Sequence, residues 1–518
     1  MALTRWLTQR YASADARVLA LGRVVLAIVL LLDLGRRARG LEHWYTNHGL
    51  LPNHTLLWKP PFEYTFSLFF TASRTGEAAV GFALCAGAYL MLLVGFRTKV
   101  AQVLSLVAVL SLHGRNEFIQ NGGDAVLSEL ALWTCFLPTG RRYSLDAVRA
   151  ARDRSAGLAG VPDAAAPVVS LGVFVLVGQL ATIYAFNALQ KTGQTWRAGS
   201  VVHYMLHQDC NDTWLAVWLR PHFTLTMSKA FTWAAWATEA TLPFLLLSPF
   251  GQRYTRRAAA LLIVALHAGF ALFLNLGIFV PAMLAFTPNL LTAADADLFD
   301  RWLSRCRPRF AALDRPLLRR ASEWLVARAT PPARAPTSSR LPLGVAEIRE
   351  GLCAVIALCA TSQALAENAA ASHFKPEWQP KWMHATAIYL QAFQGWAMYA
   401  PDPPAGDQNL FVDAVTRDGR HVDPFNAVAS PGNPHTGADI QPHLRQDVLF
   451  FAYGLRLPWT PAYWTAFQEW ILRYPERTKN PNDAILSFQA FLVEHDSPPP
   501  GEQGPRNLRK TSFLKYPP

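Results

Sequence analysis

A lysine at the end of an apolar run is the residue best placed for proton chemistry. Lys191 follows the run from Val168 to Ala188, and a polar turn then leads to Trp196 and Gly199. Partial burial removes water from an amine, which lowers its pKa and leaves a neutral group that accepts a proton. The alternative is a lysine that extends its ammonium group to the membrane interface, and the residues by themselves favour that alternative.

Two further runs contain polar groups that are costly inside a membrane. His267 lies within one run, and Asn275 follows in the same stretch. These two residues either bind a ligand or form hydrogen bonds between helices, and the sequence does not separate the two roles. Glu239 lies within the run from Phe231 to Leu247. A buried carboxylate needs a partner or a proton, so a pair with an arginine or lysine is its first interpretation and a catalytic role the second.

Two turns complete the set of candidate residues. Asn121 and Asp124 stand in a polar segment between two runs, where they either line a cavity or cap a helix. The cap is the simpler interpretation of Asp124. His48 stands in the aromatic segment from Trp44 to Pro52, and anchoring at the membrane interface is a sufficient explanation of that segment.

Apolar runs of near membrane-spanning length must position these residues. Hydrophobic residues make up 51% of the chain and charged residues only 16%, against about 25% charge in soluble proteins. We expect about nine spans, some of them short enough to be tilted or re-entrant. The runs are Leu19–Leu34, Ala78–Phe96, Val100–Leu112, Ala125–Leu137, Val168–Ala188, Phe231–Leu247, Ala258–Leu274, Ile278–Leu291 and Leu352–Leu365.

The distribution of arginine predicts the orientation. Arginines concentrate in alternate connecting segments, with Arg36, Arg37 and Arg39 as the exception. The positive-inside rule then places the N-terminus in the cytoplasm and the chain after about Asn368 outside the inner (cell) membrane. The net charge of +12 is explained by loops that face anionic lipid, so we expect the bilayer as a partner and no nucleic acid.

The chain divides into four predicted parts: a membrane domain (1–295), an Arg- and Pro-rich cytoplasmic segment (296–346), a last membrane helix (347–368) and an extracytoplasmic domain (369–518). The last part mixes helical and strand patterns. Asp418-Gly419 predicts a hairpin turn, since this pair suits a type I′ turn. The fold class is therefore a mainly α, polytopic membrane bundle with a small α+β C-terminal domain.

Several reaction classes lack their motifs. The sequence contains no Walker loop, dinucleotide-binding fingerprint, HExxH or GxSxG. Its six cysteines include no CxxC pair. We therefore expect no nucleotide-driven transport, no zinc or serine hydrolysis and no metal.

The order of several motifs resembles the bacterial HTTM (horizontally transferred transmembrane domain) family, which is related to the vitamin K-dependent γ-glutamyl carboxylase of animals. The likeness covers roughly residues 15–300 and continues in the tail. The motifs are Tyr45–Pro52, Phe136–Pro138 with Tyr143–Asp146, Lys191 with Trp196 and Gly199, His267 through Asn275 to Phe279, and Gln394–Pro403.

This resemblance implies a reaction and roles for the candidate residues. In the carboxylase family, reduced vitamin K loses a proton near a lysine at the position of Lys191, and oxygen converts it into a strong base. That base removes a γ-proton from glutamate, and CO2 adds to the carbanion. The implied roles are Lys191 as the catalytic residue, Trp196, His267 and Asn275 as quinol-binding residues, and Asn121, Asp124, Glu239 and His48 as residues that support substrate binding.

The leading hypothesis is thus a carboxylase-like membrane enzyme that uses reduced vitamin K or another quinol, O2 and CO2 on a secreted peptide. Departures from the animal enzyme motivate the alternative, a non-carboxylating maturation or export factor for a secreted peptide. The animal enzyme has a histidine where this chain has Asn121–Asp124, and its luminal portion is far larger.

Overall fold

The computed structural model describes residues 2–58, 66–155, 166–311, 343–375, 378–392, 395–429, 444–445, 447–502, 504 and 506–517. The prolines of the expected cytoplasmic linker, at positions 331, 332 and 336, lie outside these residues, as do Phe393 and Gln394. The boundaries between the four predicted parts stay predictions.

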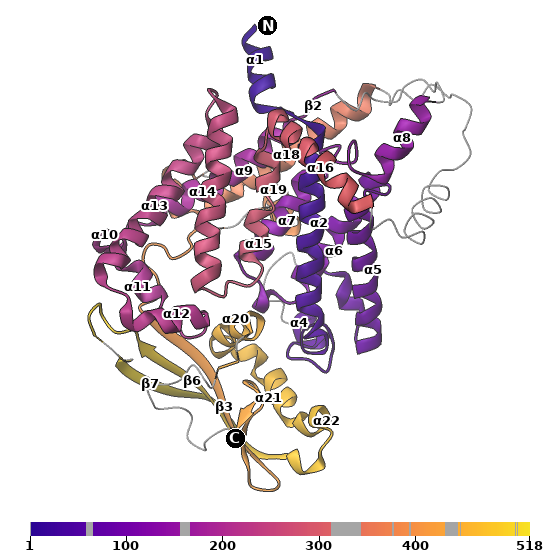
Figure 1. The fold of residues 1–518 in the computed structure, drawn as a ribbon. Coiled ribbons are helices and arrows are strands. Elements are labelled where there is room, and N and C mark those ends of the chain that lie inside the picture. Colours follow the sequence, from indigo (N-terminus) through magenta and orange to yellow (C-terminus); the bar gives the residue numbers. More distant parts are fainter. Residues whose placement is uncertain are drawn as a thin grey trace.

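A bundle of long helices forms the N-terminal part of the molecule (Figure 1). Each predicted apolar run overlaps a helix or a pair of short helices, although several runs extend a few residues beyond the helix ends and the run from Val168 begins in a short strand, β2 (Val168–Val169). The bundle helices are α2 (Ala16–Ala38), α5 (Thr75–Val94), α6 (Thr98–Gly114), α7 (Gly122–Thr134), α9 (Leu171–Gln190), α13 (Leu225–Leu247), α14 (Gln252–Phe273), α15 (Phe279–Leu284) with the 3₁₀ turn η4 (Thr287–Leu290), and α18 (Leu343–Glu367).

The count of nine membrane crossings is not confirmed. Within the described residues, four helices are long and apolar enough to cross a membrane: α2, α5, α9 and α14. The run from Ile278 to Leu291 forms only α15 and η4, which at about 1.5 Å per residue are shorter than the hydrocarbon core of about 30 Å. They nevertheless run beside α2, because Gly277 faces Arg36 and Asn289 contacts Gly22.

Further helices, most of them short, connect and flank the bundle. They are α1 (Ala2–Tyr11), α3 (Leu41–Tyr45), α4 (Asn53–Trp58), α8 (Leu145–Ser155), α10 (Gln194–Ala198), α11 (Val201–Met205), α12 (Trp214–Leu219), α16 (Ala293–Ala311) and α19 (Lys381–Tyr389). Local sequence fixes where the long helices begin: the Asp15 carboxylate accepts a hydrogen bond from the backbone N–H of Arg17 at the start of α2, and the Ser170 hydroxyl accepts one from Gly172 at the start of α9.

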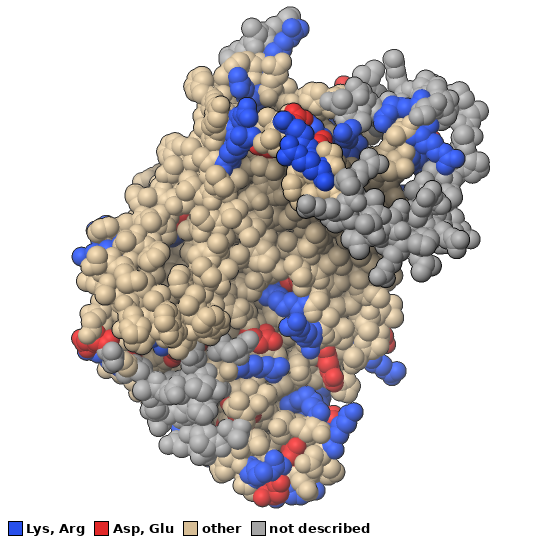
Figure 2. Space-filling view, in the orientation of Figure 1, with Lys and Arg blue, Asp and Glu red and all other residues tan. Residues whose placement is uncertain are grey.

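The molecular surface shows the pattern of a membrane protein. In Figure 2, lysines and arginines gather at the end of the bundle that carries α1, α8 and α16. Charged side chains of both signs are present again on the C-terminal domain. The band between these two ends carries few charged side chains on this face. Uncharged side chains therefore predominate, on this face, over the part of the bundle that a bilayer would surround.

The C-terminal part is a small α+β domain, as the sequence predicts. Its antiparallel sheet has the strand order β5-β4-β3-β6-β7. The helix α20 (Val448–Arg456) lies where the sheet meets the bundle, and α21 (Trp464–Leu472) and α22 (Tyr474–Thr478) lie beside the sheet (Figure 1). The Asp418-Gly419 turn joins β3 to β4, so the predicted hairpin is confirmed. The strands are β3 (Gly406–Thr416), β4 (His421–Asp423), β5 (Val428–Ala429), β6 (Ile485–Asp496) and β7 (Arg506–Tyr516); β1 (Ser13–Ala14) pairs with β2 (Val168–Val169) elsewhere.

Aromatic residues join this domain to the bundle. Phe450 and Tyr453 of α20 pack on Trp44, and Tyr453 also packs on Phe118 from the turn before α7. Buried residues of both parts belong to one hydrophobic core. Because large apolar areas are buried at this contact, the domain is fixed on the end of the bundle where α9 ends.

Candidate functional site

A mostly apolar cavity of about 290 Å³ lies between α9, α13 and α14. This volume is close to the lower end of the range of roughly 300–1,000 Å³ for small-molecule sites. The short helices α10 and α11 form part of its wall, and Met398 and Tyr399 contribute from the segment before the C-terminal sheet. Four candidate residues from separate parts of the sequence line it: Lys191, Trp196, Glu239 and His267.

Lys191 is the residue that directly follows α9, and its ammonium group forms an ion pair with Glu239 of α13. Only 4% and 6% of the two side chains are exposed. The amine also lies 4.5 Å from the centroid of the Trp196 ring, which stabilises its charged form. Burial lowers the pKa of Lys191, and the Glu239 carboxylate opposes that shift. The expected basic partner of Glu239 is therefore Lys191.

His267 and Tyr184 supply neutral polar groups to the same cavity. His267 Nδ1 lies 2.9 Å from the Ile263 carbonyl, which only accepts hydrogen bonds, so Nδ1 carries the proton and Nε2 is an acceptor. The Tyr184 ring lies 6.3 Å from the His267 ring. Among the described residues the buried Tyr184 hydroxyl has no hydrogen-bond partner. Such a group costs free energy unless a ligand or water satisfies it.

The segment from Trp396 to Asp402 closes the cavity on the side of the C-terminal domain. The Asp402 carboxylate accepts hydrogen bonds from the backbone N–H groups of Gln194 and Thr195, at 3.2 and 2.8 Å. It thereby caps the first turn of α10 from a distant part of the chain. A Cβ on Gly193 would lie 2.1 Å from this carboxylate, so the close approach requires glycine there.

The other candidate residues lie outside this cavity. Asn275 lines an adjoining, more open hollow, and its backbone N–H donates to the Asn211 carbonyl at 2.6 Å. His48 is exposed in the turn after α3. Asn121 is the N-cap of α7, and Asp124 completes a capping box by accepting a hydrogen bond from the Asn121 backbone N–H. Asp124 therefore takes part in the cap, but it is not the N-cap residue.

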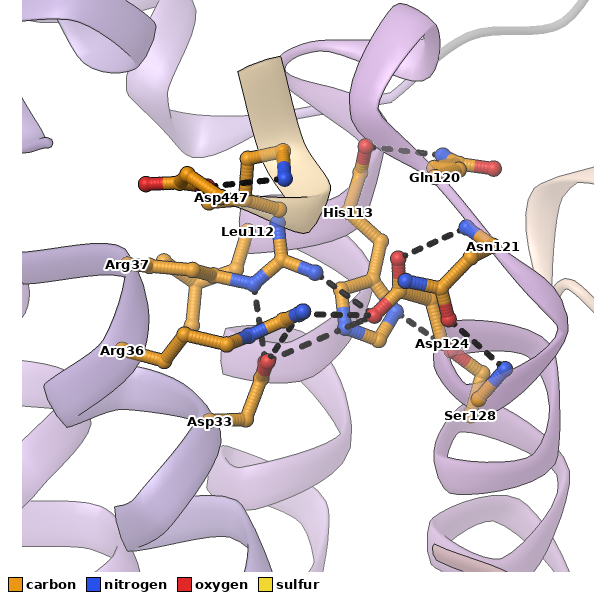
Figure 3. Close-up of polar contacts among 12 residues, drawn as sticks. Asp33, Arg36, Arg37, Leu112, His113, Gln120, Asn121, Asp124, Ser128 and Asp447 are labelled. Carbon is orange, nitrogen blue, oxygen red and sulfur yellow. Dashed lines mark hydrogen bonds and ion pairs between the residues drawn. The ribbon is translucent and has the colours of Figure 1, made fainter. Parts of the chain in front are cut away.

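Asp124 also belongs to a buried ionic network (Figure 3). Arg37 donates to Asp124 at 2.6 Å and to Asp33 at 2.8 Å, and Arg36 donates to Asp33 at 2.8 Å. His113 Nε2 lies 3.5 Å from Asp33. Two guanidinium groups thus neutralise two carboxylates, and this pairing explains why Arg36 and Arg37 depart from the arginine pattern of the loops. The network ties α2 to α6 and α7.

Sequence reasoning missed Tyr184, Tyr399 and the partners of this network. A tyrosine within an apolar run, such as Tyr184, has no sequence feature that distinguishes a cavity residue from an ordinary core residue. Tyr399 lines the cavity only because tertiary contacts bring its segment there. For Asp33, Arg36 and Arg37 there was a usable signal. Their spacing of three and four residues places opposite charges on one face of a helix.

Comparison with known proteins supports the assignment made from the motifs. The HTTM domain matches residues 11–294, which is more than half of the chain and includes Lys191, Trp196, Glu239 and His267. Neither a curated protein nor a solved structure matches the chain. The match covers the bundle from α2 to the start of α16 and all the cavity residues of α9, α13 and α14. The chain is a membrane protein that belongs to the HTTM domain family.

Proposed function

We propose that the protein is a carboxylase-like enzyme of the inner membrane that uses a quinol, O2 and CO2 to carboxylate glutamate in a secreted peptide. The observation that carries the proposal is the buried Lys191–Glu239 pair in the wall of an apolar cavity. A buried acid–base pair beside an apolar binding site is an arrangement suited to proton abstraction.

The residues of the cavity fit a lipid-borne quinol. Its lining is aromatic and aliphatic apart from a few polar groups, which matches a flat aromatic ring with two hydroxyl groups. Tyr184 and His267 Nε2 offer a donor and an acceptor. Phe231 lines the cavity and yet is 49% exposed on the helix surface, so the cavity reaches the face that lipid would cover. A quinol with an isoprenoid tail is able to enter from that side.

The chemistry assigns separate tasks to the chain and to the quinol. Overall, quinol, O2, CO2 and a glutamate residue give quinone epoxide, water and γ-carboxyglutamate, which carries one additional ionised carboxylate and releases one proton. The quinol and O2 together supply the strong base. Lys191 in its neutral form accepts the quinol proton, and Glu239 holds the resulting ammonium ion. The apolar wall keeps water from the reactive species.

The proposal places the peptide at the same end of the bundle as the C-terminal domain. Met398 and Tyr399 separate the cavity from that domain, so a glutamate side chain would approach past them. With the N-terminus in the cytoplasm, this end faces the exterior, where a secreted peptide is found.

A photoreactive menaquinone analogue tests whether the cavity holds the quinone. We expect labelled residues on α9, α13 and α14, and we expect Ala235→Trp to lower labelling at least tenfold, because Ala235 lines the cavity and a tryptophan would fill it. The control is Ala237→Trp, since Ala237 is exposed on the same helix and does not line the cavity. Labels confined to other surfaces of the chain, unchanged in Ala235→Trp, would refute the assignment of the cavity.

A further inference from the structure

A second cluster of polar side chains lies where the C-terminal sheet meets the bundle. Asp209 belongs to the loop between α11 and α12, Asp407 stands near the start of β3, and His495 near the end of β6. Asp407 and His495 are directly opposite in the β3–β6 pairing. All three residues are buried, with 7%, 4% and 3% of their surface exposed. None of them lines the cavity that contains Lys191.

The cluster has an excess of negative charge. It contains three buried carboxylates, because Asp212 lies beside Asp209 and Asp407. Within the part of the chain that the structure describes, the only arginine or lysine paired with them is Arg220, which donates to Asp209 Oδ1 at 3.0 Å and also contacts Asp212. One guanidinium group cannot balance three ionised carboxylates. Burial, together with the neighbouring carboxylates, therefore raises the pKa of Asp407 to about 7 and that of Asp212 to about 8 when no cation is bound.

The Asp33–Asp124 network of Figure 3 provides the contrast. It also brings a histidine close to two buried aspartates, but Arg36 and Arg37 neutralise both carboxylates. A cation is therefore not needed there. The cluster at Asp407 has the same donor groups and lacks the second arginine among the described residues.

Asp407 Oδ2 accepts a hydrogen bond from the backbone N–H of Asp209, but the imidazole of His495 makes no direct hydrogen bond to either carboxylate. His495 Nε2 lies 3.7 Å from Asp209 Oδ2 and 3.9 Å from Asp407 Oδ2, beyond normal hydrogen-bond length. The three donor atoms lie within 4.8 Å of one another. Around a metal ion with bonds of about 2.1 Å, adjacent donor atoms are about 3.0–3.5 Å apart, so modest inward shifts would complete a site.

Two atoms in the cluster also lack partners. Among the described residues, His495 Nδ1 and Asp212 Oδ1 are buried without a hydrogen bond. The Asp209 side of the cluster opens onto a hollow of about 380 Å³ that His495 also lines. An ion and its water ligands therefore have a route of entry.

We propose that Asp209, Asp407 and His495 bind one divalent ion of the Zn²⁺ class, with water completing its coordination. Two carboxylates and one imidazole are a donor set typical of such ions, and Arg220 on the other oxygen of Asp209 orients that ligand. This proposal departs from the expectation of no metal. It is independent of the proposed quinol chemistry.

The ion would fix the C-terminal sheet to the loop that borders the cavity. Asp212 pairs with Leu274 across an isolated β-bridge, and Leu274 lines the cavity. Two ligands come from β3 and β6, and the third from the loop before α12. A metal ion that binds only the folded chain would stabilise that contact.

Cobalt titration of the full-length, EDTA-treated protein tests the site, because Co²⁺ occupies Zn²⁺ sites and gives visible absorption bands. We expect saturation near one Co²⁺ per chain in the wild type, competition by Zn²⁺, and a Tm that rises with Zn²⁺. In Asp407→Asn and His495→Ala the bands should fall at least tenfold. His421→Ala is the matched control, because His421 is an exposed histidine on the neighbouring strand β4.

The wild-type titration decides the proposal even if a variant fails to fold. Absorption bands that do not saturate, or a Tm unaffected by Zn²⁺ up to millimolar concentration, would overturn it. Equal bands in the wild type and in a folded His495→Ala variant would also overturn it, because the ion would then lie elsewhere. Quinone photolabelling of the same samples reports separately on the Lys191 cavity.

Discussion

Replacement of Lys191 by alanine should lower quinol-dependent CO2 incorporation by about 10²–10⁴-fold, which is the usual contribution of a positioned acid or base. The Lys191 amine lies in the wall of the cavity and pairs with Glu239. In its neutral form the amine is the group of this pair that accepts a proton. Without its partner, Glu239 would bind a proton instead of remaining a buried charge, so the fold should persist. Incorporation of labelled CO2 per mole of purified enzyme is the measurement.

Two further variants separate the chemistry of Lys191 from its charge. Lys191→Arg keeps a cation beside Glu239 but cannot supply a neutral base, so its activity should fall nearly as far as that of Lys191→Ala. Lys381→Ala, at an exposed lysine of α19, should retain full activity. If Lys191→Arg remained fully active, Lys191 would act as a fixed positive charge and the base would have to be another group.

Replacement of Arg37 by leucine should destabilise the bundle by about 3–5 kcal/mol, the range measured when one partner of a buried ion pair is removed. Arg37 is completely buried and donates to both Asp33 and Asp124. Its loss leaves Asp124 with only the longer ion pair to Arg36, at 3.6 Å, and Arg36 would then have to serve both carboxylates. Thermal unfolding of the detergent-solubilised protein should show a clearly lower Tm.

Arg39→Leu is the matched control for this variant. Arg39 is exposed two residues further along the chain, and its replacement should change the Tm little. The double variant Arg37→Leu, Asp124→Asn should recover part of the lost stability, because it removes the stranded charge. Equal Tm values for Arg37→Leu and Arg39→Leu would show that the network contributes no net stability.

The sequence predicted the helical bundle, the C-terminal α+β domain and the main members of the cavity. Apolar runs report burial or lipid contact wherever they occur, so the helix positions were accessible. The number of membrane crossings was not accessible. The helices α6, α7 and α15 are short, while α13 and α18 are long but are not among the four helices that are both long and apolar enough to cross a membrane. The Asp418-Gly419 turn was predictable since it depends on two adjacent residues.

The tertiary partners were less accessible. The charge of Glu239 was enough to predict a basic partner. That this partner is Lys191 could not be predicted, because it depends on α9 and α13 packing side by side. Asp407 and His495 are far apart in sequence, and only the β3–β6 register brings them together. No local spacing rule would have predicted that cluster, and the expectation of no metal rested on the absence of local HExxH and CxxC motifs.

Carboxylation by the purified, full-length protein tests the central claim most directly. The protein would be placed in lipid nanodiscs with reduced menaquinone, O2, labelled CO2 and a glutamate-containing peptide. We predict equal amounts of quinone epoxide and labelled γ-carboxyglutamate, both dependent on O2 and both lost in Lys191→Ala. Photolabelling of the cavity without epoxide and without labelled peptide would contradict the proposed reaction and leave a quinone-binding protein that does not carboxylate.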